Sequence, residues 1–194
     1  MTTIIKKYND ARVYLINDAS IAQKIALSIL FAVILAVASQ IKIFLSFTPV
    51  PLNLGTFAVC IAGMTLGGFW GFISVAIYML AAAVGLPVIA NSSFLGATTG
   101  YIVGYAICAL VLGKYTEKGN IKKDNFIKTS AVLFIFQIGI IHIFGMIGLY
   151  IWSSAIGSPY TLTEVVMKGT VPFLLGDSIK AMILSLSMGF ILKK

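Results

Sequence analysis

The sequence predicts an all-α integral membrane protein, a compact six-transmembrane-helix bundle with both termini cytoplasmic. The composition carries this prediction, because 59% of the residues are hydrophobic, only 10% are charged and the mean hydropathy is +1.02. Soluble domains are roughly half apolar and about a quarter charged. The 194 residues have room for around six apolar spans of about 20 residues each, joined by short connections.

Length and apolarity, rather than an amphipathic period, define the expected spans. We expect them at residues 21–45, 54–66, 69–84, 99–112, 130–152 and 172–192. The second span covers only about 20 Å at 1.5 Å per residue. Gly67, Gly68 and Gly71 follow it, so we expect a tight turn into the third span within the membrane. The prediction is one membrane domain over 21–194, preceded by a cytoplasmic arm over 1–20.

The basic residues set the expected orientation. Eleven of the fourteen Lys and Arg residues fall on one side of a six-span chain: Lys6, Lys7, Arg12, Lys24, Lys114, Lys118, Lys122, Lys123, Lys128, Lys193 and Lys194. The positive-inside rule makes that side the cytoplasm. The formal net charge of +8 then reflects membrane topology, and we expect no nucleic-acid partner.

Asp177 and Lys180 lie three residues apart within the last apolar span. A charged side chain at membrane depth costs several kcal/mol unless a partner compensates it. Residues three apart on a helix share one face, so carboxylate and ammonium project together. We predict a buried functional site here. The alternative is an internal ion pair that only neutralises two buried charges.

The two expected outer loops have an unusual composition. Residues 46–53 and 86–100 combine Pro, Gly, hydroxyl and amide side chains with Phe47 and Phe94. A purely solvated loop would be more charged, so we predict that these loops fold back over the bundle and line a pocket. The alternative is a pair of tight hydrophobic connectors.

Several familiar chemistries are absent from the sequence. Gly113-Lys114 is followed by Tyr115 rather than Ser or Thr, so no phosphate-binding loop is present. We interpret the one histidine, His142, as a hydrogen-bonded packing residue. Cys60 and Cys108 are interpreted as small core residues, too far apart in register to form a metal pair. A lipid-modifying membrane enzyme would need clustered aspartates or a histidine near the cytoplasmic face, so we expect neither catalysis nor a cofactor.

Small residues recur at four-residue spacing and favour close helix packing. They are Gly63, Gly67 and Gly71, then Gly100 and Gly104, and on the first span Ala32 and Ala36. Internal packing is the preferred interpretation for the glycines.

Four motifs occur in order along the chain: PVPLNLGTFAV at 49–59, AVGLPV at 83–88, TTGYIVGY at 98–105 and PFLLGDSIKA at 172–181. In this combination the chain resembles the BioY family, the biotin-binding S components of energy-coupling factor (ECF) transporters, over roughly residues 22–192. The resemblance implies a six-helix, multi-pass subunit of the bacterial plasma membrane that captures biotin from outside.

The resemblance also implies partners. In the family, an Ala-x-x-x-Ala surface on the first helix docks on a transmembrane T component, which two ABC-type ATPases power. Ala32 and Ala36 match this motif, and Ala22 and Ala26 repeat the spacing earlier.

For biotin, the implied site combines charge with apolar walls. A carboxylate, Asp177, accepts from the ureido N–H groups, while an ammonium or amide, Lys180 or Asn91, donates to the ureido carbonyl. Tyr101 and Phe94 are candidate walls. Asn53 and Thr98 lie within the matching motifs and complete the candidate set. An S component for another vitamin, such as thiamin or riboflavin, remains the alternative.

Overall fold

The structure, a computed structural model, describes residues 13–90, 94–121 and 125–191, the last four as backbone only. Its helices are α2 (Ile21–Gln40), α3 (Gly55–Leu66), α4 (Gly68–Ala83), α5 (Thr99–Glu117), α6 (Phe126–Phe136), α7 (Ile143–Ala155), α8 (Leu162–Gly169) and α9 (Leu174–Ile191). A π-helix, η1 (Gln137–His142), joins α6 to α7, and a 3₁₀ turn, η2 (Val171–Phe173), precedes α9. The strands β1 (Lys42–Ile43) and β2 (Leu52–Asn53) pair antiparallel. The all-α prediction is confirmed apart from this short hairpin.

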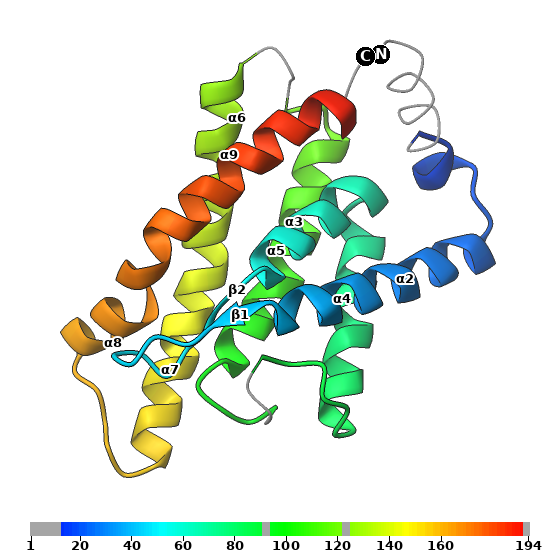
Figure 1. The fold of residues 1–194 in the computed structure, drawn as a ribbon. Helices are drawn as coiled ribbons and strands as arrows, with labels where there is room; N and C mark the ends of the chain where they lie inside the picture. Colours follow the sequence, from blue (N-terminus) through cyan, green and yellow to red (C-terminus); the bar gives the residue numbers. More distant parts are fainter. Residues whose placement is uncertain (1–12, 91–93, 122–124, 192–194) are drawn as a thin grey trace.

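Helix α5 forms the centre of the bundle, packed against α3, α4, η1 and α7 (Figure 1). The contacts are close because glycines lie at the crossings. A Cβ atom on Gly104 would lie 2.8 Å from Ile141 Cα, and one on Gly63 would lie 2.7 Å from the Ala109 carbonyl oxygen. The interpretation of these glycines as packing positions is confirmed.

The predicted tight turn lies between α3 and α4. Gly67 has φ +84°, a left-handed conformation that glycine adopts without the steric cost of a side chain. The next amide, Gly68 N–H, donates a 2.9 Å hydrogen bond to Glu117 Oε1 at the end of α5. This acceptor satisfies an N–H group at the start of α4 that has no partner within the helix.

Several helix ends meet at one end of the bundle. α2 and α4 run side by side in the same direction, since Ser28 donates to the Trp70 carbonyl and Tyr78 donates to Ser39. Ser185 on α9 donates 3.0 Å to the Phe126 carbonyl at the start of α6. Four basic residues of the predicted inner side lie near helix ends: Lys24 near the start of α2, Lys114 and Lys118 at the end of α5, and Lys128 near the start of α6.

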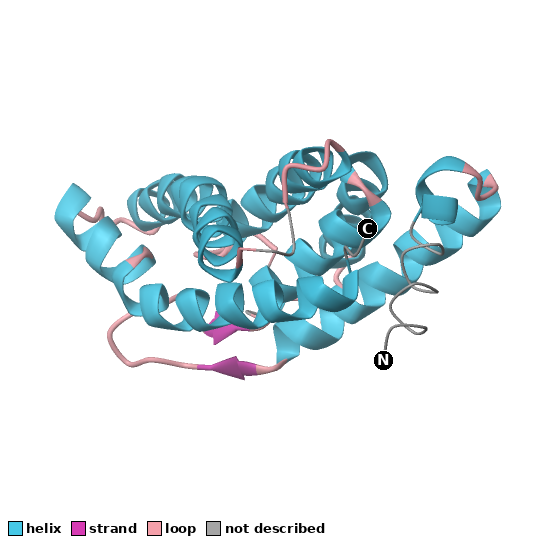
Figure 2. Cartoon of the chain, turned by 90° about the horizontal axis from the view of Figure 1, so that it is seen from above, coloured by secondary structure: helices cyan, strands magenta, loops and turns pink. Residues whose placement is uncertain are grey.

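Several boundaries differ from the sequence prediction: α5 ends at Glu117 rather than 112, and the α6–α7 segment covers 126–155 rather than 130–152. The first helix ends at Gln40 rather than 45, because the chain turns into the β1–β2 hairpin, where Lys42 pairs with Asn53. Figure 2 shows these strands at the edge of the helices. The last expected span is preceded by a separate helix, α8, whose start is stabilised by a reciprocal capping interaction between Thr161 and Glu164.

Three described helical segments are long and apolar enough to cross a bilayer: Ile21–Gln40, Phe126–Ala155 and Leu162–Ser187. Helices α3 and α4 are also apolar but shorter. The second of the long segments contains α6, η1 and α7, which Figure 1 shows as one continuous rod.

The predicted docking pair, Ala32 and Ala36, lies toward the bundle side of α2. Ala32 is buried within the core, and Ala36 is half-buried against it. Ala32 shares a helix face with Ser28 and Ser39, whose hydrogen bonds hold that face on α4. Ala32 therefore packs inside the bundle, whereas part of Ala36 is exposed.

Candidate functional site

The predicted acid and base lie beside a small cavity of about 30 Å³, enough for about two water molecules. Its lining comes from α2, α3, α4, α5, η1, η2 and α9, and from the segments around β2 and before α5. Five of the predicted site residues line it: Asn53, Thr98, Tyr101, Asp177 and Lys180.

Asp177 and Lys180 form a buried ion pair on one face of α9. Lys180 Nζ lies 2.9 Å from Asp177 Oδ1, and only 1% of Asp177 and 8% of Lys180 is exposed. The same ammonium donates 3.0 Å to Thr56 Oγ1 on α3, and the Thr56 hydroxyl donates 3.3 Å to Asp177 Oδ1. The pair is therefore held between two helices that are distant in sequence.

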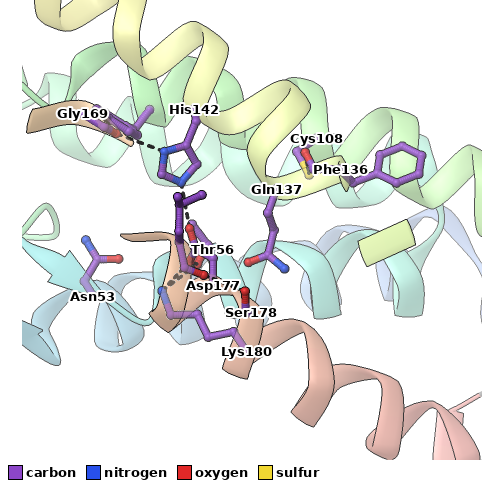
Figure 3. A network of polar contacts seen from close by, with 12 residues as sticks. Asn53, Thr56, Cys108, Phe136, Gln137, His142, Gly169, Asp177, Ser178 and Lys180 are labelled. Atoms are coloured by element: carbon purple, nitrogen blue, oxygen red, sulfur yellow. Dashed lines mark hydrogen bonds and ion pairs between the residues drawn. The ribbon is translucent and has the colours of Figure 1, made fainter. Parts of the chain in front are cut away.

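His142 completes the network on the other side of the carboxylate (Figure 3). Its Nε2 lies 2.7 Å from Asp177 Oδ2, and its Nδ1 lies 3.0 Å from the Gly169 carbonyl oxygen. The sequence interpretation anticipated a hydrogen-bonded histidine but missed that its partner is the site carboxylate. The two residues are 35 positions apart, and no local spacing connects them. The one signal in the sequence was that His142, like Asp177, is a polar side chain in the middle of an apolar span.

Tyr101 and Phe173 supply an aromatic wall. The Tyr101 ring meets the His142 ring edge-on at 5.7 Å between centroids, and its centroid lies 6.3 Å from that of Phe173. The Tyr101 hydroxyl donates 2.6 Å to the same Gly169 carbonyl that faces His142. Tyr105 and Tyr78 also line the cavity, and the sequence analysis named neither of them.

Asn53 and Thr98 lie on the cavity in different ways. Asn53 Oδ1 accepts 2.7 Å from the Gly55 N–H and 3.4 Å from the Tyr105 hydroxyl, so it fixes the start of α3. Thr98 is buried, and its hydroxyl has no hydrogen-bond partner among the described residues. A buried polar atom of this kind is costly unless something bonds to it.

Two candidate residues are not placed on the cavity. Phe94 is half-buried against the core and does not line the cavity, while its carbonyl accepts 2.6 Å from the Thr99 hydroxyl. Asn91 lies outside the described residues, so its role stays a prediction.

The interpretation of the cysteines as core residues is confirmed. Cys60 and Cys108 are buried free thiols, and the Cys108 thiol donates a 3.9 Å hydrogen bond to the Phe136 carbonyl. Among the described residues, no cluster of three His, Cys, Asp or Glu side chains could hold a metal ion.

Comparisons with known proteins agree with this architecture. A family model described as the BioY family matches residues 8–193. The biotin transporter BioY of Rhizobium etli is 31% identical over 169 residues, which are 84% of this chain and 89% of that protein. The biotin transporter BioY of Thermotoga maritima is 32% identical over 162 residues, 81% of this chain and 88% of that protein.

A solved structure shares the fold. The crystal structure of the S-component for biotin from an ECF-type ABC transporter matches with a TM-score of 0.73 and 24% sequence identity. The match covers 87% of this chain and 89% of that one.

Proposed function

Because this chain belongs to the BioY family, we propose that it binds biotin as the S component of an ECF-type vitamin importer. The observation that carries the proposal is the Asp177–Lys180 pair, almost fully buried and facing a cavity with an aromatic wall. Its role is transport rather than catalysis. An S component for thiamin or riboflavin is the alternative, and the names of the relatives do not favour it.

The polar groups match the ureido ring of biotin in number and kind. An ammonium has three N–H groups, and Lys180 directs two of them to Thr56 and Asp177, so the third serves the ureido carbonyl. Each carboxylate oxygen accepts more than one hydrogen bond; Asp177 Oδ2 therefore takes a ureido N–H in addition to His142. The Thr98 hydroxyl and the Tyr101 ring complete the contacts.

Binding has to enlarge the cavity. About 30 Å³ is far below the roughly 300 Å³ or more of ordinary small-molecule pockets. Ile89 and Ala90, in the connection between α4 and α5, line the cavity. The described residues of this connection, 84–90 and 94–98, form neither helix nor strand, so this is the part of the cavity wall that moves aside at lowest cost.

We further propose six membrane passages with both termini cytoplasmic, in the plasma membrane of a bacterial cell. Residues 21–194 form the membrane domain, and residues 1–20 form a cytoplasmic arm. The partners are a T component and two ABC-type ATPases. Biotin is the substrate, and no separate cofactor is required.

For the T component, the proposed docking residues are Ala22 and Ala26. Both are exposed on α2, and they repeat the four-residue spacing that lets helices approach closely in lipid. Ala32 and Ala36, the pair that the family resemblance implies, are the alternative docking pair, with Ala32 buried and Ala36 half-buried.

Isothermal titration of the purified protein tests the function. We expect one biotin per chain, bound without nucleotide, and no heat with thiamin or riboflavin. Lys180→Met should lose binding, whereas Lys168→Met, a surface lysine on α8, should bind as the parent does. Clear binding of another vitamin with no response to biotin would contradict the proposal.

A further inference from the structure

Both ring nitrogens of His142 face hydrogen-bond acceptors. Nδ1 lies 3.0 Å from the Gly169 carbonyl oxygen, and Nε2 lies 2.7 Å from Asp177 Oδ2 (Figure 3). A carbonyl oxygen has no hydrogen to donate, so Nδ1 must carry one. At 2.7 Å a second hydrogen must lie between Nε2 and Oδ2, because two bare acceptors would repel each other. The His142–Asp177 pair therefore holds two protons.

The chemistry of the two groups places the second proton on the imidazole. Imidazole is a much stronger base than a carboxylate. The Asp177 carboxylate also accepts hydrogen bonds from Lys180 and Thr56, and such donors favour its ionised form. Burial disfavours an isolated charge. Here both cations, His142 and Lys180, lie within hydrogen-bond distance of the carboxylate.

We propose that His142 is a positioning residue held as an imidazolium, so that one carboxylate, Asp177, serves two buried cations, His142 and Lys180. The buried cluster then has one positive charge in excess. The other titratable groups near it are the neutral phenols of Tyr101, Tyr105 and Tyr78 and the thiol of Cys60 on α3.

None of the other described acids balances this charge. Glu117 binds the α4 amide at the opposite end of the bundle, Glu164 pairs with Lys168 on the surface, and Asp18 is exposed before α2. The local helix geometry explains how the histidine reaches Asp177: η1 is π-helical, and such wide turns are frequent at functional sites.

The consequence for the ligand rests on the proposed function. An excess positive charge in a poorly solvated cavity favours a ligand acceptor oxygen with partial negative charge, and it disfavours a cation. The ureido carbonyl of biotin fits this preference. The cyclic guanidine analogue, 2-iminobiotin, presents a cation at the same place at neutral pH.

The protonation state can be measured without any ligand. The sequence contains a single histidine, so protein labelled with ¹⁵N-histidine gives the nitrogen spectrum of one imidazole ring. At neutral pH we expect two pyrrole-type signals, each with an attached proton. A pyridine-type signal would overturn the inference while leaving the biotin proposal standing. In Asp177→Asn the imidazolium should lose its counter-charge, and a pyridine-type signal should appear at the same pH. Unchanged signals in that variant would also overturn it.

Binding variants test the positioning role. His142→Phe should weaken biotin binding at least about tenfold and should narrow the discrimination between biotin and 2-iminobiotin. His142→Gln keeps an N–H donor toward Asp177, so it should retain part of the parental affinity. This variant tests the role even if His142→Phe does not fold. Gln137→Leu, on the same π-helical turn, is the matched control and should bind as the parent does. A folded His142→Phe variant, or a His142→Gln variant, with parental affinity and discrimination would overturn the positioning role.

Discussion

The Lys42 ammonium donates a 2.7 Å hydrogen bond to the backbone carbonyl of Ala90, a residue that lines the cavity. Just before the hairpin, Gln40 Nε2 donates to the carbonyls of Pro87 and Ile89 at 3.1 and 3.0 Å. The end of α2 and strand β1 therefore hold the connection that covers the candidate site.

Loosening this attachment should speed biotin release. Lys42→Met removes one hydrogen bond to this connection and Gln40→Leu removes two, and each variant also removes the Lys42–Gln40 hydrogen bond. We expect each single variant to release biotin several times faster and the double variant to release it faster still, because a hydrogen bond contributes about 1 kcal/mol and a charged donor somewhat more. The dissociation rate measured with labelled biotin checks this. Lys168→Met is the control, and equal rates in all variants would show that the cover moves independently of Lys42.

Asp177→Asn keeps the shape of the side chain and removes its charge. The binding free energy of biotin should become less favourable by about 1.5 to 3 kcal/mol. The variant loses both the charge-assisted hydrogen bonds to the ligand and the negative charge that balances Lys180. Titration calorimetry on the folded variant measures the change. Ser178→Ala, at the half-buried neighbour whose hydroxyl donates to the Leu174 carbonyl, should bind normally. Parental affinity in Asp177→Asn would assign the pair a structural role only.

Tryptophan substitutions separate docking from packing on α2. Ala22→Trp with Ala26→Trp should preserve biotin binding but abolish co-purification with the T component, since bulky side chains block close helix approach. Ala32→Trp should instead destabilise the protein by about 1 to 3 kcal/mol, because it overfills the core. Thermal unfolding and pull-down assays distinguish the two effects. Normal complex formation by the Ala22→Trp/Ala26→Trp double variant would show that the docking surface does not include these two residues.

Removing the Glu117 carboxylate should weaken the turn between α3 and α4. Glu117→Ala leaves the Gly68 amide without its 2.9 Å acceptor, a loss comparable to a missing helix cap, about 1 kcal/mol. The midpoint of thermal unfolding in detergent should fall. Lys118→Ala, an exposed neighbour at the end of α5, provides the control. An unchanged midpoint in Glu117→Ala would mean that water replaces the carboxylate without cost.

The sequence supported the helical fold well because apolar length is a local property. Helices α3 and α4 lie within a residue of their predicted bounds, and the turn at Gly67 was visible from its glycines. Asp177 and Lys180 stood out because charges are rare in such stretches. Helix α8 was missed because it is short and amphipathic, so apolar length does not reveal it.

Contacts between distant segments could not be predicted in the same way. His142 meets Asp177 only because α9 packs beside the rod formed by α6, η1 and α7. The spacing of Ala32 and Ala36 is equally suited to an internal or an external helix partner. The burial of Ala32, with Ser28 and Ser39 bonded to α4, shows an internal partner for that residue, which the spacing alone could not.

The π-helical turn at Gln137–His142 makes the length of this segment critical. Each α-helical residue advances the chain by about 100° around the axis. Deleting one residue here would restore a regular α-helix and turn α7 by that angle relative to α6. With α6 kept against α9, the imidazole would then point away from the carboxylate. One codon lost within this turn would thus disconnect the site, although every residue that lines it would still be encoded.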